Sequence, residues 1–187
     1  MIKQWKRYDE EILNLASIDP LTQLYNRRFL MDSFKRELQI CERRENATDA
    51  VSCIILDLDH FKQVNDVHGH QVGDEVLVKV AEVVQQSIRD YDIAGRYGGE
   101  EFLVVLPNTP LPVAKVVAER YRERIAELTW PVGPGETLQI TASFGVATCV
   151  VGQKVAVNNM IKAADDALYQ AKAAGRNCVV LADSAVN

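Results

Sequence analysis

The stretch "GRYGGEEFLVV", residues 95–105, decides how the fold of this chain is interpreted. Two adjacent glycines and two adjacent glutamates stand between a short apolar segment, "DIAGRY", and an aliphatic one, "EFLVVLP". Apolar segments separated by glycines are typical of a β-hairpin. We therefore predict a hairpin whose tip carries Gly98, Gly99, Glu100 and Glu101. A tight turn alone accounts for the glycines, but it does not account for two adjacent like charges.

An earlier candidate strand also ends in acidic residues. "VSCIILDLD", residues 51–59, is a continuous β-branched and aliphatic run that predicts a buried central strand. A carboxylate at the end of a buried strand is costly unless it is solvated, paired or bound to a cation. For Asp59 we prefer a cap on the helix that follows. If the hairpin lies beside this strand, Asp57, Glu100 and Glu101 meet at one sheet edge, where cations such as Mg²⁺ reduce their repulsion.

The remaining patterns alternate between helices and strands. Amphipathic helices are predicted for residues 73–90, 112–128 and 158–174. "TLQITASFGVATCV", residues 137–150, predicts one strand, in which Gly145 marks a close backbone approach or a bulge. We interpret the preceding "PVGPGE" as a turn. Because the hairpin makes the sheet mixed, we expect an α/β or α+β fold, with a mixed central β-sheet surrounded by helices.

Length and composition limit the class of protein. The 187 residues suggest one domain, and the net charge of −5 argues against a surface that coats nucleic acid. No apolar run approaches the roughly 20 residues that span a bilayer, and the N-terminus is too charged for a signal peptide, so we expect a cytoplasmic location. The four cysteines form no CxxC pair, so neither a zinc site nor a disulfide set is indicated. Residues 1–16 predict an amphipathic helix that lies on the domain or pairs with its copy in another chain.

Several blocks of the sequence occur together in the order of one known family. They are "DPLTQLYNRR", "LDLDHFKQVND", "GHQVGD", "RYGGEEF", "SFGVA" and "ADDALYQAKAAGRN", spread over residues 16–182. With them the chain resembles the GGDEF-domain diguanylate cyclases, which make cyclic di-GMP from two GTP. The resemblance implies a palm-like nucleotidyl cyclase fold over residues 17–187, with residues 1–16 as a linker or signalling helix after an upstream sensor domain. Gln23 departs from the family, which usually has glycine there, so we expect a local backbone difference and retained activity.

The resemblance also implies a metal site. Asp57 and Glu100 would be metal ligands, and the backbone carbonyl of Leu58 would assist them. Glu101 would hold a second metal or activate the 3′-hydroxyl of the substrate. Two Mg²⁺ or Mn²⁺ ions per GTP site are expected. The histidines of "HGH", residues 68–70, are interpreted as structural or supporting residues, because Mg²⁺ prefers oxygen ligands.

The family's substrate contacts fall on matching residues. Asn65 and Asp74 would recognise guanine, whose N1–H and N2–H groups donate to a carboxylate. Adenine lacks these donors, which disfavours ATP. For Lys172, complementing the dipole of its helix is a second role that is compatible with phosphate binding. The triphosphate would contact the two glycines, the first residues of a predicted helix and two basic side chains. These residues are Gly98, Gly99, Phe61, Lys62, Lys172 and Arg176.

The resemblance further implies dimerisation and product inhibition. Each chain would offer one GTP site, so two chains would face each other about a two-fold axis. Arg89 and Asp92 in "RDYD" match the family's inhibitory product site, and Arg120 would add a contact, although an exposed helix arginine is its simpler interpretation. Three alternatives stay open. They are a silent cyclic di-GMP receptor, a cyclase that makes a cyclic mononucleotide, and an interaction domain that dimerises through the N-terminal helix.

Overall fold

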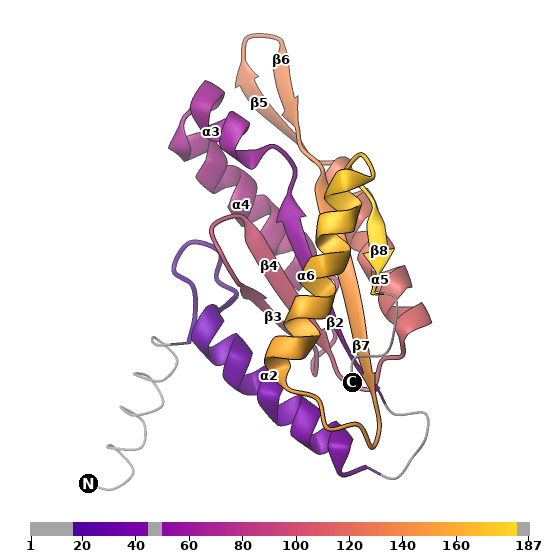
Figure 1. Cartoon of the computed structure of the whole chain (residues 1–187). Coiled ribbons are helices and arrows are strands. Elements are labelled where there is room, and N and C mark those ends of the chain that lie inside the picture. Colours follow the sequence, from indigo (N-terminus) through magenta and orange to yellow (C-terminus); the bar gives the residue numbers. More distant parts are fainter. Residues whose placement is uncertain (1–16, 45–49, 183–187) are drawn as a thin grey trace, which may run out of the picture.

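Figure 1 shows a computed structural model of the chain, in which residues 17–44 and 50–182 are described. The helix expected within residues 1–16 lies outside this part. The described helices are α2 (Arg27–Glu42), α3 (Phe61–His68), α4 (His70–Gln85), α5 (Leu111–Ala126) and α6 (Val157–Ala173). The described strands are β1 (Tyr25–Asn26), β2 (Ala50–Leu58), β3 (Ile93–Arg96), β4 (Glu101–Leu106), β5 (Thr129–Gly133), β6 (Glu136–Gln139), β7 (Ala142–Val150) and β8 (Val179–Leu181).

Six of these strands form one mixed sheet in the order β1-β3-β4-β2-β7-β8. The central strand β2 is antiparallel to both β4 and β7, whereas the outer pairs β1–β3 and β7–β8 are parallel. All nine residues of β2 are buried, which confirms the central strand predicted from its continuous apolar run. The predicted hairpin is also confirmed, since β3 and β4 pair in an antiparallel register across "YGGE".

Helices cover both faces of the sheet and create two separate cores. On one face, alternate β2 residues such as Ile54 and Leu56 pack with side chains of α4 and α5. On the other face, Cys53 and Ile55 pack with side chains of α2 and α6. In Figure 1, α2 and α6 lie in front of the sheet and α4 and α5 lie behind it. Burial on both faces explains why β2 lacks the polar alternation of a strand with one exposed face.

Gly145 of β7 lets helix α6 lie directly on the sheet. A Cβ atom at this position would stand 1.9 Å from the carbonyl oxygen of Ala164 and 2.5 Å from the amide nitrogen of Leu168. The close backbone approach expected at this glycine is therefore confirmed, because any side chain would collide with the backbone of α6. The contact fixes α6 over β2 and β7, and so directs the end of α6 toward the end of β2.

The segment predicted as one strand over residues 137–150 is two strands in two sheets. β6 pairs with β5 as a separate hairpin, which projects beyond the main sheet beside α3 in Figure 1. The chain enters the main sheet only at β7, after Ile140 and Thr141. Our single-strand prediction was wrong here, because the apolar pattern continues across the point where the chain leaves one sheet for the other. None of the helices in the described ranges has the length and apolar character required to cross a membrane.

Candidate active site

Three acidic residues, Asp57, Glu100 and Glu101, lie where β2 ends and β4 begins. This end of β2 points toward the top of Figure 1. Asp57 stands directly opposite Glu101 in the β2–β4 register. The amide of Leu58 donates to the carbonyl oxygen of Glu100 at 3.3 Å, so the tip of the hairpin is joined to the end of β2. The structure therefore brings together the acids that the sequence placed at one edge, from segments more than 40 positions apart in the chain.

The electrostatics of this edge disfavour three ionised acids. Asp57 is 6% exposed, and burial raises the pKa of its carboxyl group above the ordinary value. Burial and then the charge of Asp57 raise the pKa values of Glu100 and Glu101. Such groups gain from a cation, which lowers the cost of keeping all three ionised.

The ammonium group of Lys172 already provides one positive charge. Its Nζ atom lies 2.8 Å from Oδ1 of Asp57, at the end of α6. Within the described ranges, no three His, Cys, Asp or Glu side chains are arranged to hold a metal ion. The donors nevertheless suit a hard cation, since they are carboxylate and carbonyl oxygens. The ammonium group of Lys172 balances the charge of Asp57, as a bound metal ion would.

The two glycines of the hairpin tip serve different spatial needs. Neither has a left-handed φ angle, so the turn itself does not require glycine. A Cβ atom on Gly98 would lie 2.2 Å from Oε2 of Glu101, so this glycine leaves room for the glutamate carboxylate. A Cβ atom on Gly99 would meet nothing within 4 Å. Gly99 therefore opens the backbone to whatever binds in front of the hairpin.

Arg96 fixes the hairpin tip, and this contact was not expected from the sequence. Its guanidinium donates to the carbonyl oxygen of Gly99 from Nη2 at 2.8 Å and from Nε at 3.2 Å. The same group lies 3.5 Å from Oδ1 of Asp19, which also accepts from the amide and the hydroxyl of Thr22. Burial raises the pKa of Asp19, but these hydrogen bonds and the charge of Arg96 outweigh it and lower the pKa. The only indication of this contact in the sequence was a basic residue shortly before the two glycines.

The neighbouring Gln23 adopts the backbone conformation that glycine would favour. Its φ angle is 59°, in the left-handed region. A glycine at this position would adopt that angle without the steric cost that a side chain brings. The side chain of Gln23 donates to the carbonyl oxygen of Pro20 at 2.9 Å. The departure from the family pattern therefore falls on a residue with a strained backbone, outside the acidic edge.

The residues expected to recognise guanine lie on two successive helices. Gly73 of α4 makes room for Asn65 of α3, because a Cβ atom there would stand 1.9 Å from Oδ1 of Asn65. Asp74, the next residue along α4, is exposed. Phe61 and Lys62 form the first turn of α3, where backbone N–H groups point out of the helix end. His68 and His70 flank the junction between α3 and α4.

Asp59 does not cap α3, which corrects the sequence-based interpretation. The residue before α3 is His60, with a left-handed φ angle of 59° and no side-chain capping bond. The carboxylate of Asp59 instead accepts from the hydroxyls of Thr141 and Ser143 and from the amide of Asn177. These partners lie 82 or more positions away, so short-range capping preferences could not indicate them.

A second polar cluster surrounds the turn between α4 and β3. The amide of Arg89 donates to Oδ2 of Asp92 at 2.9 Å, and its guanidinium donates to the hydroxyl of Tyr91 at 3.0 Å. Arg120 of α5 donates to the carbonyl oxygen of Ser87 in the same turn at 2.8 Å. Burial raises the pKa of Asp92, although Arg89 and Arg120 partly offset it. The structure thus brings together the three residues of the expected inhibitory site.

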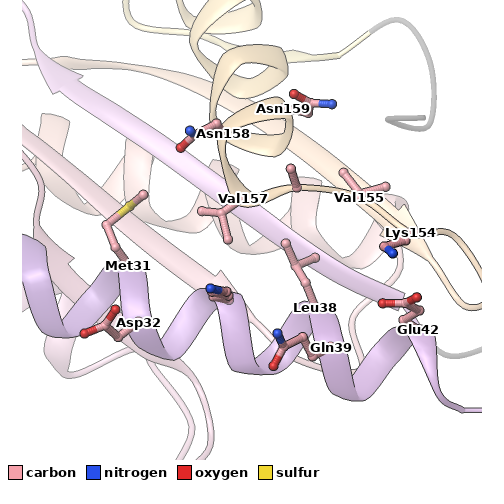
Figure 2. A pocket seen from close by; sticks show the side chains of 12 residues that line it. Met31, Asp32, Leu38, Gln39, Glu42, Lys154, Val155, Val157, Asn158 and Asn159 are labelled. Carbon is pink, nitrogen blue, oxygen red and sulfur yellow. The ribbon is translucent and has the colours of Figure 1, made fainter.

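A groove of about 590 Å³ lies elsewhere, between α2 and the start of α6. Figure 2 shows apolar side chains such as Leu38 and Val157 within it and charged groups such as Asp32 and Glu42 along it. Val157 and Lys172 are separated along α6 by roughly 20 Å, from the helical rise per residue. The groove is therefore distinct from the acidic edge.

The fold and the acidic edge together define a palm-like nucleotidyl cyclase domain. The family model described as "Diguanylate cyclase, GGDEF domain" matches residues 16–178. The response regulator PleD of Caulobacter vibrioides is 39% identical over 185 residues, which cover 95% of this chain and 40% of PleD. This chain therefore belongs to the GGDEF-domain family of diguanylate cyclases. It spans less than half the length of PleD.

Solved structures agree with this assignment. The GGDEF domain of DgcB from Caulobacter crescentus, in complex with c-di-GMP, superimposes with a TM-score of 0.83 at 34% identity. That match covers 90% of this chain and 94% of the DgcB chain. The active GGEEF domain of a diguanylate cyclase from Vibrio cholerae gives a TM-score of 0.77 at 37% identity, over 87% of this chain and 100% of that chain. The expected mixed fold is thus confirmed.

Proposed function

We propose that this chain is a diguanylate cyclase domain, which condenses two GTP into cyclic di-GMP and two pyrophosphates. The observation that carries the proposal is the pairing of Asp57 with Glu101 at a sheet edge where Gly99 leaves open space. A buried aspartate and partly buried glutamates beside an accessible backbone suit a phosphate-bearing substrate that arrives with cations. The family assignment and the relatives named as diguanylate cyclases support the same activity.

We further propose a divalent cation site at this edge. Cyclases of this family generally use a divalent metal. Asp57, the carbonyl of Leu58, Glu100 and Glu101 would hold Mg²⁺ or Mn²⁺, two ions per GTP site. When bound, such ions neutralise phosphate charge and lower the pKa of an attacking hydroxyl.

The substrate would be held from three sides. Asp74 would accept from N1–H and N2–H of guanine, and Asn65 would meet a further edge group. The backbone of Phe61, Lys62 and the two glycines would border the triphosphate. Lys172 and Arg176 at the end of α6 would supply its positive charge. These contacts hold the α-phosphorus in line with the incoming nucleophile, which is the main demand of phosphoryl transfer.

The chemistry needs one proton acceptor and one leaving group for each bond formed. The 3′-oxygen of one GTP attacks the α-phosphorus of the other, the bond between the α-phosphorus and its bridging oxygen breaks, and pyrophosphate leaves. Glu101 is the proposed acceptor of the 3′-hydroxyl proton, because it stands opposite Asp57 at the edge where the substrate is proposed to bind. The reverse attack closes the ring. Since each chain holds one GTP, two chains must face each other about a two-fold axis.

We also propose that the product inhibits the enzyme at the cluster of Arg89, Asp92 and Arg120. The two guanidinium groups suit guanine edges and phosphate. Tyr91, which is 53% exposed and hydrogen-bonded to Arg89, adds an aromatic surface beside them. The same cluster favours the second candidate function, a receptor that binds cyclic di-GMP without making it.

The proposal is tested by incubating the purified chain with GTP and Mg²⁺ and separating the products by chromatography. We expect cyclic di-GMP with two pyrophosphates per molecule, and no product from ATP. Cyclic GMP as the sole product would establish a mononucleotide cyclase instead. Absence of product together with tight binding of added cyclic di-GMP would establish the receptor.

A further inference from the structure

Asp59 is a buried carboxylate that contacts the end of the helix carrying Lys172. It is 4% exposed. Its Oδ1 atom accepts from the hydroxyl of Ser143 at 2.7 Å, and its Oδ2 atom accepts from the hydroxyl of Thr141 at 2.6 Å and the amide of Asn177 at 3.1 Å. Its own amide donates to the carbonyl oxygen of Thr141 at 2.8 Å. Buried carboxylates persist when several donors satisfy them in this way.

The donor Asn177 belongs to a turn with unusual backbone geometry. Gly175, Arg176 and Asn177 have φ angles of 113°, 65° and 45°. The left-handed region is unfavourable for residues with a side chain, so two such residues in succession must be held by their surroundings. The amide of Arg176 donates to the carbonyl oxygen of Ala171 at 3.1 Å, and the Asn177 side chain accepts from Arg122 at 3.3 Å. The bond to Asp59 ties this turn to the end of β2.

Two aspartates of one strand end therefore hold one segment at two points. Asp57 pairs with Lys172, and Asp59 binds the turn after α6, at Asn177. The contact of Asp57 is with a half-exposed ammonium group that substrate phosphates also attract. The contact of Asp59 is with a backbone amide and is buried. The buried contact of Asp59 therefore holds the turn independently of the ion pair made by Lys172.

We infer that Asp59 is a positioning residue, which fixes the Gly175–Asn177 turn so that the side chain of Arg176 is directed at the triphosphate of the substrate. This role rests on the proposed function, because Arg176 is a proposed phosphate contact. Asp59 itself touches neither the substrate nor the reacting atoms. Substitution by asparagine removes the negative charge that strengthens these hydrogen bonds and leaves one acceptor oxygen instead of two, so the anchor of the turn is weakened.

The test is a double-mutant cycle on binding of a non-hydrolysable GTP analogue with Mg²⁺, measured by titration calorimetry. We expect Asp59→Asn to weaken binding about tenfold, which corresponds to about 1.4 kcal/mol. In the Arg176→Ala background, the same substitution should change the affinity by less than about twofold, since interacting sites are not additive. Equal losses in both backgrounds, or no loss in either, would overturn the inference. In turnover, KM should rise while kcat stays within about twofold.

Two controls separate positioning from general destabilisation. Ser52→Ala removes a buried hydroxyl that bonds Thr109 and Thr148 toward the opposite end of β2, so it should lower stability and leave GTP affinity unchanged. If Asp59→Asn does not fold, Thr141→Val removes one donor to Asp59 and should show the same dependence on Arg176.

Wild-type protein that binds the analogue but makes no cyclic dinucleotide refutes the proposed cyclase alone. Wild-type protein that does not bind it refutes both proposals.

Discussion

Glu101 lies opposite Asp57 and is the residue whose charge the proposed chemistry needs most. We expect Glu101→Gln to reduce formation of cyclic di-GMP by about 10²- to 10⁴-fold, the usual contribution of a positioned acid or base. Because burial and Asp57 disfavour its ionised form, the amide should leave the protein equally or more stable. Initial rates and thermal unfolding of the variant test both statements. Glu123→Gln, at an exposed position of α5, is the matched control.

The acidic edge should also make the ligand-free protein more stable as the pH falls. The pKa values of Asp57, Glu100 and Glu101 are raised above the ordinary 3.8 and 4.5, so the folded chain binds protons more readily than the unfolded chain. This contribution to the unfolding free energy is complete below the ordinary values and is lost as the pH rises through the raised ones. Asp19, with its lowered pKa, has the opposite effect at lower pH.

The measurement is urea unfolding from pH 7 to pH 4 without divalent cations. Wild type should gain stability from these groups as the pH falls toward their ordinary pKa values, and a Glu100→Gln, Glu101→Gln double variant should gain less. Identical pH profiles for the two proteins would contradict the assignment of raised pKa values to this edge.

At the scale of single residues, the sequence predicted which acids lie together at the candidate site better than it predicted the contacts that neighbouring residues make. Asp57, Glu100 and Glu101 could be placed together, because a buried strand and a hairpin tip with paired acids are local patterns. The role of Asp59 could not, since its donors are 82 to 118 positions away and a capping preference was the nearest local explanation. At Gln23 we expected a local backbone difference because the family usually has glycine there, but Gln23 instead adopts the left-handed angle that glycine favours.

At the scale of elements, two glycines should respond to alanine in opposite ways. Gly145→Ala forces a methyl group into the backbone of α6, so we expect a loss of at least about 1–3 kcal/mol in unfolding free energy. Gly99→Ala meets open space, so stability should stay within about 0.5 kcal/mol while GTP affinity falls. Denaturant unfolding and GTP titration of both variants test the pair. Unchanged affinity in Gly99→Ala would contradict a substrate in front of the hairpin.

Elements were predicted where one strand or helix has an uninterrupted pattern. β2 and the β3–β4 hairpin follow from local sequence, and α4, α5 and α6 follow from helical spacing of apolar residues. The division between β6 and β7 does not follow from local sequence, because Thr141, which lies between them, donates to Asp59 from another part of the chain. Long-range hydrogen bonds of this kind leave no periodic pattern in the sequence.

At the scale of the whole molecule, activity should depend on protein concentration. With one proposed GTP site in each chain, the proposed reaction requires two chains. We expect specific activity to rise with protein concentration at low concentration and to level off when the dimer is saturated. Initial rates over a wide dilution series, with sedimentation at the same concentrations, test this. Constant specific activity for a monomer would contradict the two-chain mechanism.

The proposed feedback by the product also concerns the whole molecule. Arg89→Ala should relieve inhibition by added cyclic di-GMP, because it removes the guanidinium that donates to the hydroxyl of Tyr91 while leaving the acidic edge intact. Inhibition curves and product binding by calorimetry check the expectation, with Lys79→Ala on the exposed face of α4 as the control. If the variant is inhibited as strongly as wild type, Arg89 does not belong to the inhibitory site.

The anchoring of the α6–β8 turn has a consequence for the order in which the protein is made. In a chain still under synthesis, Asp57, Asp59 and the two acids of the hairpin are made before α6 exists. Asp57 then lacks its ammonium partner, and Asp59 lacks its amide donor 118 positions downstream. The acids therefore lack these partners until nearly all of the domain has been translated. A truncated product that ends before α6 contains the acids but lacks the ammonium group of Lys172 and the amide of Asn177.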